Sequence, residues 1–366
     1  MATRRSAIDP LLGLIAPQAL ASPVSAACAY GALASVTSFA AAALERRLVS
    51  GADIYWGSQH LIVHSYLSNL STILDFALLN PLAILFLLRS RQIIASDPRL
   101  SQSETRNDNI LRWIVSLCCA VLSILLMVAY SQSFLYGRFF DAIVTISDSG
   151  RSFVTMTGWV VFFWTGLFTY ILISSALSQV TYVVRIARLR TSEVTYDPLH
   201  EDGAAGLRVL ATPALEFTKA SLVLLVTGVV FWIYDRVMAK AALTDRTASI
   251  AIFIVIVFPL FAIPIARLHY LMCDLREQLL RKVLGGEPRS FRRLSVSPDV
   301  ERSDSATLKR LRDDIEAAEK LRSCVLSFPT WPMSTQTLVT CGAYFAGVAA
   351  PLIGKVAPLI SGALGL

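Results

Sequence analysis

A carboxylate inside an apolar stretch is the polar residue of this sequence with the clearest chemical potential. Asp75 lies in such a stretch and is followed by Asn80 and Pro81. Inserting an ionisable side chain at the centre of a membrane span costs about 2.5–3.5 kcal/mol, so such a residue is a functional candidate by default. Pro81 predicts a kink whose freed backbone carbonyls meet a polar partner. Two roles for Asp75 stay open: an ion site, or a hydrogen bond that packs two helices together.

Further polar residues in apolar segments are candidates for lining a conduction path. Ser174, Ser178 and Thr181 recur at helical spacing and therefore share one helix face. A stripe of hydroxyl groups either lines a water-filled path or packs against a neighbouring helix. Lys355 lies in the last apolar segment, where it either lines a pore or extends to the membrane surface from a C-terminal anchor.

Four potential metal ligands occur within six positions, namely Asp197, His200, Glu201 and Asp202. Carboxylate oxygens and imidazole nitrogens bind divalent cations, and two following glycines permit a tight turn around an ion. The same residues also fit an ordinary turn, because Asp-Pro and Asp-Gly pairs are common in loops. The sequence leaves both interpretations open.

Three arginines surround one aromatic residue in Arg289, Phe291, Arg292 and Arg293. Such a cluster beside a membrane span binds anionic lipid headgroups, a phosphate-bearing regulatory ligand or a nucleic-acid strand. It also fits the ordinary enrichment of basic residues in cytoplasmic loops, which requires no dedicated ligand.

The composition indicates what must position these residues. Of the 366 residues, 55% are hydrophobic and 16% are charged, and the mean hydropathy is +0.59. Soluble domains carry about a quarter charged residues, so this chain is a membrane protein. The composition also excludes a disordered chain, a collagen and a disulfide-rich secreted scaffold. The predicted fold class is all-α, a polytopic transmembrane helical bundle in contact with the lipid bilayer.

Between five and seven segments are predicted to span the membrane, because a spanning helix needs roughly 20 apolar residues. The five clear segments are 69–88, 110–132, 153–184, 216–235 and 247–269. Two weaker segments are 22–43, which is rich in alanine, and 338–364, which is interrupted by two prolines and Lys355.

The distribution of basic residues predicts the orientation. With seven spans, 24 of the 33 Lys and Arg fall on one side of the membrane and seven on the other. Cytoplasmic loops are enriched in Lys and Arg, so the first side is cytoplasmic. Most of the formal charge of +7 is thereby explained by topology.

Three parts of the chain are predicted. Residues 1–269 form a transmembrane helical domain with cytoplasmic loops at 88–112 and 185–215. Residues 270–337 form a cytoplasmic helical segment that contains a mobile basic loop, and 338–366 form a membrane helix or a re-entrant segment. Apolar residues recur at helical spacing from 305 onwards, so 303–328 is a predicted surface for a soluble protein partner.

Motifs of several enzyme classes are missing from the sequence. It contains no G-x-x-x-x-G-K-[ST], no dinucleotide fingerprint, no H-E-x-x-H and no G-x-S-x-G. The two halves show no clear inverted repeat of the kind found in secondary transporters. We therefore expect no cofactor, and a non-enzymatic protein is favoured.

Two short elements carry a resemblance. They are a His-x-Asp-Gly-Ala-x-Gly-Leu loop at His200, Asp202, Gly203, Ala204, Gly206 and Leu207, and a Pro-x-Trp-Pro element at Pro329, Trp331 and Pro332. In these elements the chain resembles a loose group of uncharacterised bacterial multi-pass inner-membrane proteins. The resemblance implies a location in the bacterial inner membrane but no activity.

Three functional hypotheses follow. The leading one is a homo-oligomer that forms or gates an ion-conducting path under control of its cytoplasmic segment, with a membrane-depolarising defence effector as a special case. The second is a metal-dependent membrane enzyme that acts on a lipid or phosphate substrate at residues 197–202. The third is a sensor or scaffold that binds a soluble partner through 303–328.

Overall fold

A computed structural model describes nine continuous stretches of the chain and a set of single positions between 309 and 343. The stretches are 22–45, 52–56, 59–63, 70–97, 113–126, 144–147, 152–191, 206–238 and 244–285. Their contacts divide them into two compact units. Unit 1 takes in the described residues of 22–182 and 213–261, and unit 2 those of 183–212 and 262–343. The predicted domain boundaries at 269 and 337 stay predictions.

Five helices in the described residues are long and apolar enough to cross a membrane. They are Pro23–Leu44, Thr72–Ser96, Met156–Arg188, Arg208–Thr227 and Phe258–Arg281. The all-helical transmembrane fold predicted from the sequence is therefore confirmed, and the alanine-rich segment at 22–43 forms one of the five helices. A shorter apolar helix, Trp113–Leu126, occupies the middle of the segment predicted at 110–132. The segment predicted at 338–364 lies largely outside the described residues.

Helix α2 (Pro23–Leu44) begins with a capping box. The Ser22 hydroxyl accepts a hydrogen bond from the Ser25 backbone amide at 3.1 Å, and the Ser25 hydroxyl accepts one from the Ser22 amide at 3.3 Å. Pro23 occupies the first helical turn, where its missing N–H costs no hydrogen bond. These contacts explain why a segment of modest hydropathy forms a helix that starts at a defined residue.

The second span consists of three consecutive elements, α3 (Leu70–Leu74), η3 (Asp75–Leu79) and α4 (Asn80–Ser96). The middle element is a π-helical turn, which is wider than the α-helical turns on either side. The sequence predicted a kink at Asn80 and Pro81, and the structure has an extra residue in the turn that precedes them.

Three longer helices follow, α6 (Met156–Arg188), α7 (Arg208–Met238) and α8 (Thr244–Gly285). Helix α7 begins at Arg208, eight residues before the predicted start of that span. Helix α8 continues to Gly285, well past the predicted span end at 269 and in agreement with the helical continuation expected from the sequence. The observed starts of α6 and α7 differ from the predicted starts of these spans, because hydropathy alone locates the end of a helix poorly.

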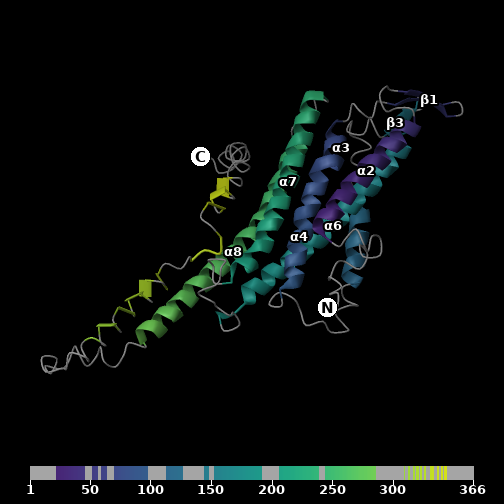
Figure 1. Ribbon diagram of the computed structural model, residues 1–366. Coiled ribbons are helices and arrows are strands. Elements are labelled where there is room, and N and C mark those ends of the chain that lie inside the picture. The colour runs from purple at the N-terminus through teal and green to yellow at the C-terminus, as the bar shows by residue number, and fades with distance from the viewer. Residues whose placement is uncertain are drawn as a thin grey trace, which may run out of the picture. The chain divides into compact units, whose positions relative to one another are not determined.

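A small antiparallel sheet accompanies the helices of unit 1. Its strands are β1 (Ala52–Trp56), β2 (Gln59–Val63), β3 (Val144–Ser147) and β4 (Ser152–Val154), in the order β1-β2-β3-β4. Ile62 of β2 pairs with Ile146 of β3. These strands lie mostly outside the predicted spans and were not predicted, because such short strands carry little periodicity. Figure 1 shows the β1 and β3 labels beside one end of α2.

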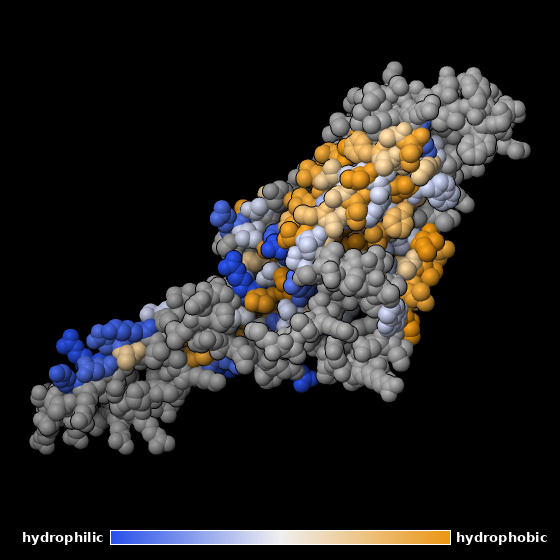
Figure 2. Space-filling model, turned by 45° about the vertical axis from the view of Figure 1, so that its right-hand side comes forward, coloured by the Kyte–Doolittle hydropathy of each residue, from blue (hydrophilic) through white to orange (hydrophobic). Residues whose placement is uncertain are grey.

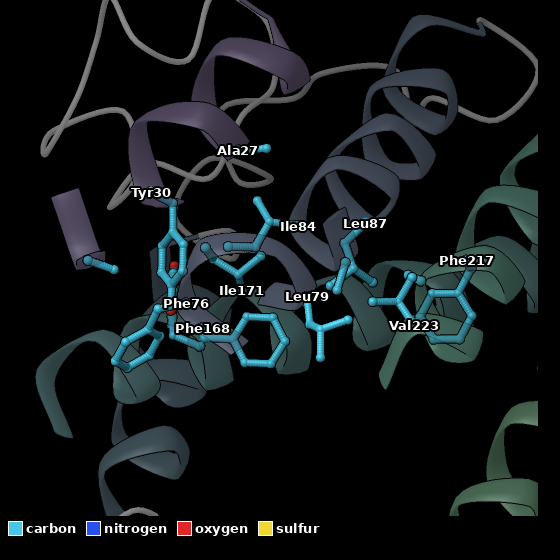
Figure 3. Close-up of a cluster of buried hydrophobic side chains, with 14 of the residues drawn as sticks. Ala27, Tyr30, Phe76, Leu79, Ile84, Leu87, Phe168, Ile171, Phe217 and Val223 are labelled. Atoms are coloured by element: carbon cyan, nitrogen blue, oxygen red, sulfur yellow. The ribbon is translucent and has the colours of Figure 1, made fainter. Parts of the chain in front are cut away.

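The core of unit 1 is formed by side chains from α2, η3, α4, α6 and α7. In Figure 3, Tyr30 projects from α2 toward Phe76 and Phe168, and Leu87 points toward Phe217 and Val223. Small residues on α2, such as the buried Ala27 and Ala34, let the neighbouring helices approach closely. Association of the helices in this unit therefore rests on close packing.

The outer faces of the helices are also apolar. Large hydrophobic side chains are exposed there, including Val36 (64%), Trp159 (65%) and Phe163 (64%). Figure 2 shows hydrophobic side chains, in orange, over much of the coloured surface of the helices. Contiguous apolar surface of this kind is rare on soluble monomers. Such apolar faces are suited to contact with the hydrocarbon chains of a lipid bilayer.

Candidate functional site

The π-helical turn η3 positions the carboxylate of Asp75. The backbone N–H of Asn80 donates to the Asp75 carbonyl, five residues earlier. The side chain of Asn80 donates from Nδ2 to Asp75 Oδ2 at 3.1 Å. Backbone and side chain of one residue thus hold Asp75 across the same widened turn.

Pro81 gives a physical reason for the turn. Proline has no N–H, and its ring clashes with the carbonyl four residues earlier in a regular α-helix. A turn with one extra residue relieves that clash, and such bulges occur often at functional sites. The Asn80-Pro81 pair therefore both shapes the turn and supplies the amide that contacts Asp75.

One oxygen of the Asp75 carboxylate has no hydrogen-bond partner in the part of the chain that the structure describes. Oδ1 is buried and unpaired, whereas Oδ2 accepts the bond from Asn80. Tyr30 of α2 interacts electrostatically with the Asp75 carboxylate and with the Asn80 side chain. Its own hydroxyl hydrogen is donated to the backbone carbonyl of Trp164 at 2.9 Å. The hydrogen of Tyr30 is therefore committed elsewhere, and Oδ1 stays open.

This arrangement is suited to binding a proton or a cation. A charged carboxylate in apolar surroundings is costly unless it is paired, and an unpaired oxygen leaves that cost uncompensated. Asn80, which is 3% exposed, supplies a neutral donor and no balancing charge. The hydrogen bond that Asp75 accepts from Asn80 lies within a single span, and a packing role for the carboxylate stays a prediction.

The hydroxyl stripe predicted on the fourth span forms bonds within its own helix. Ser178 donates to the Ser174 carbonyl at 2.9 Å, and Thr181 donates to the Leu177 carbonyl at 3.0 Å. Ser174 is buried, Ser178 is half-buried and Thr181 is exposed. Such back-bonding satisfies hydroxyl groups without water. Whether these residues line a path stays a prediction.

A different polar stripe of α6 is buried. It lies one position further along the helix and consists of Ser175, Gln179 and Tyr182, each no more than 2% exposed. Gln179 approaches Ser90 of α4, and Glu216 of α7 is buried in the same unit. Ser90, Gln179 and Glu216 were not among the predicted site residues. The sequence signal that could have indicated this group is the pair Glu216 and Lys219, two charged residues three positions apart within a largely apolar segment.

In unit 2 the Pro-x-Trp-Pro element lies against α8. The ring of Trp331 stacks on His269 with a centroid distance of 4.0 Å and an interplanar angle of 18°. His269 Nδ1 donates to the Thr330 carbonyl at 2.7 Å, since a carbonyl oxygen can only accept. Arg276 donates to the Leu326 carbonyl at 2.8 Å. The side chains of α8 thus hold the segment that contains this element.

Of the His-x-Asp-Gly-Ala-x-Gly-Leu loop, the structure describes only the last two residues, Gly206 and Leu207. Gly206 has a φ of 81°, a left-handed conformation that favours glycine, and Leu207 is fully buried just before α7. The rest of that loop lies outside the described residues.

Several other predicted sites also fall outside the described residues. They are the metal-ligand candidates Asp197, His200, Glu201 and Asp202, the cluster of Arg289, Phe291, Arg292 and Arg293, and Lys355. Among the residues that the structure describes, no three His, Cys, Asp or Glu side chains are grouped to hold a metal ion. The described positions from 309 to 326 are helical, and most are exposed. A partner for 303–328 stays a prediction.

The helices and their apolar faces define a multi-pass membrane protein. No protein-family model, no curated protein and no solved structure matches the chain. The resemblance to the group of bacterial inner-membrane proteins stays a prediction that rests on the two short elements.

Proposed function

We propose that the protein is an oligomeric bacterial inner-membrane protein that forms or gates a cation-conducting path, with Asp75 as its ion-binding residue. The observation that carries the proposal is the buried and unpaired Oδ1 of Asp75. A carboxylate within a span is expensive, and its retention without a balancing cation is expected where an ion or a proton binds and leaves.

The surroundings of Asp75 support a role in gating. A π-helical turn has one residue more than an α-helical turn, so it is able to shift its hydrogen-bond register when a neighbouring segment moves. Helix α2 packs directly on this turn, where Gly31 lies next to the Phe76 carbonyl and Pro81. Movement of α2 would therefore change the position of Asp75.

Two finer features belong to the same proposal. Asp75 is only half-buried as a residue although Oδ1 is buried, and we propose that copies of the chain complete the enclosure of the carboxylate in an oligomer. The distribution of basic residues in the sequence favours a cytoplasmic location for the long segment after 269, where it would receive a regulatory signal.

Ion flux into liposomes tests the proposal. Purified protein is reconstituted, and flux of Na⁺, K⁺ and H⁺ is followed with and without a membrane potential. Asp75→Asn, which preserves size and removes the charge, is expected to lower flux at least about tenfold, a loss of 1.4 kcal/mol. Asp274→Asn, an exposed carboxylate on α8, is the matched control and should leave flux unchanged. Absence of flux in the parent protein, or full flux in Asp75→Asn, would overturn the proposal.

The special case of a defence effector has a separate test in cells. A membrane-depolarising protein stops growth and dissipates the membrane potential when it is overproduced. Asp75→Ala should relieve both effects at equal protein abundance in the membrane. Growth arrest that persists in Asp75→Ala would point to toxicity from membrane insertion alone and would remove the effector hypothesis.

A further inference from the structure

A second group of buried polar atoms connects three helices of unit 1. The hydroxyl of Ser90 on α4 donates to the Pro213 carbonyl of α7 at 3.0 Å and lies 3.4 Å from Gln179 Oε1 of α6. Ser90 is 2% exposed and Gln179 is 0% exposed. The hydroxyl group of Ser90 thus brings together oxygen atoms of three helices at one buried point.

Glu216 lies in the same contact between α4 and α7. Ser90 of α4 contacts Pro213 of α7. Phe86, four residues before Ser90, contacts Lys219 of α7, whose Nζ lies 5.6 Å from the centroid of the Phe86 ring. The two helices are therefore antiparallel here. Glu216 is three residues from Pro213 and three from Lys219, so it lies between the two contacts.

Two buried atoms of this group have no hydrogen-bond partner among the described residues. They are Glu216 Oε2 and Gln179 Nε2, and Glu216 is 6% exposed. The other carboxylate oxygen of Glu216 accepts from Lys219 Nζ at 2.6 Å. The Glu216 side chain is 8% exposed and that of Lys219 is 42% exposed. The ammonium group therefore reaches the carboxylate from the outside and is able to leave while the carboxylate stays buried.

We infer that Glu216, Gln179 and Ser90 form a binding site for a monovalent cation, and that Lys219 competes for it as a tethered cation. The single negative charge of Glu216 balances one positive charge, and the amide and hydroxyl oxygens complete the set of ligands. A divalent ion would keep an uncompensated charge in this buried setting. Lys219 bound to Glu216 represents the state in which its ammonium group takes the place of the ion.

The position of this site deepens the proposed function. Asp75 and Ser90 belong to one continuous span and are 15 residues apart, which corresponds to about 22 Å along a helix with a rise of 1.5 Å per residue. The two sites would thus lie near opposite ends of a path across the hydrocarbon region. The role of the Glu216 site as the inner end of that path rests on the proposed function, whereas cation binding at Glu216 does not.

Protection of Glu216 from a carbodiimide measures the binding directly. Dicyclohexylcarbodiimide adds to protonated carboxyl groups in apolar surroundings, and a bound cation prevents this. The full chain in detergent is treated at fixed pH in NaCl or in N-methylglucamine chloride of equal ionic strength. Labelling at Glu216 is quantified by peptide mass spectrometry. Na⁺ is expected to slow the labelling several-fold.

Two variants test the ligands and the competitor. Lys219→Met should lower the Na⁺ concentration for half-protection about tenfold or more, since a tethered ammonium group competes at a millimolar effective concentration. Gln179→Leu should raise that concentration, and it keeps the test decisive if Lys219→Met does not fold. Lys320→Met is the control, because Lys320 forms an exposed ion pair with Glu316. It should change nothing.

The outcomes separate this inference from the proposed function. Equal labelling of Glu216 in both salts, in the parent protein and in Lys219→Met, would overturn the cation site even if liposomes show flux through Asp75. Protection by Na⁺ in protein that shows no flux would support the site and refute only its place in a path.

Discussion

Gly31 of α2 lies so close to Pro81 of α4 that no larger residue fits between them. A Cβ atom at position 31 would be 2.7 Å from Pro81 Cγ and 3.5 Å from the Phe76 carbonyl oxygen. This close approach brings the backbone of α2 to the turn that carries Asp75. The neighbouring Tyr30 is thereby placed beside Asp75 and Asn80.

Gly31→Ala should therefore destabilise the protein. The added methyl group must displace the ring of Pro81, and overpacking of this kind costs about 1–3 kcal/mol. The midpoint of thermal unfolding in detergent should fall. Gly342→Ala is the matched control, because a Cβ there meets no atom of the described residues within 4 Å. Equal midpoints for the two variants would show that α2 does not pack on the turn as described.

The carboxylate of Glu45 joins the end of α2 to the beginning of α6. It accepts from the backbone amides of Met156 and Thr157, and its Oε2 accepts from the Thr157 hydroxyl at 2.7 Å. The first amides of a helix have no partners within the helix and carry partial positive charge. Glu45→Ala should cost about 1–2 kcal/mol, measured as unfolding free energy.

Glu45→Gln separates the contribution of the hydrogen bonds to this cap from that of the negative charge. It keeps an acceptor and removes the charge, so it should retain part of the stability. Glu277→Ala removes an exposed carboxylate from an ion pair with Arg281 and should cost at most about 0.5 kcal/mol. A loss in Glu45→Ala no greater than that of the Glu277 control would contradict the capping role.

The stacking of Trp331 on His269 should hold its segment on α8. Trp331→Ala removes the ring contact and is expected to speed cleavage by proteases between residues 310 and 340, without lowering the stability of the membrane helices. Trp331→Phe, which keeps an aromatic ring, should have a smaller effect. Val339→Ala changes an exposed residue of the same region and should behave like the parent.

The spans could be predicted because hydropathy and length are local properties. Long apolar runs located the helices, and Asp75 was recognised because it interrupts one of them. The polar group around Glu216 was missed because the predicted span began at 216, which placed Glu216 at its boundary. Helix α7 in fact begins at Arg208, which places Glu216 two turns inside. Its partners lie on two other helices, and no local pattern connects them.

The buried polar stripe of α6 illustrates a further limit. Ser174, Ser178 and Thr181 have the spacing of one helix face, but so do Ser175, Gln179 and Tyr182. The rotation of α6 about its axis decides which stripe faces the core, and that rotation depends on packing with other helices. Hydroxyl groups that bond to their own backbone are also stable where they face outward, so their presence did not distinguish the two faces.

Labelling from one side of the membrane tests the pairing of β2 with β3. In a variant without the six native cysteines, single cysteines replace Ser58 or Ser149, which lie between paired strands. Both should react with a membrane-impermeant maleimide added to the same side, in spheroplasts or in inverted vesicles. Reaction from opposite sides would exclude the sheet.

The pairing of β2 with β3 also limits how many times the chain crosses the bilayer. Two strands in one sheet lie on the same side, so the chain from Val63 to Val144 crosses an even number of times. The span at Thr72–Ser96 supplies one crossing, which requires a return between 97 and 143. The described helix at Trp113–Leu126 lies in this interval. Its 14 residues rise about 21 Å, less than the hydrocarbon thickness, yet the parity of the sheet predicts that it belongs to a returning span.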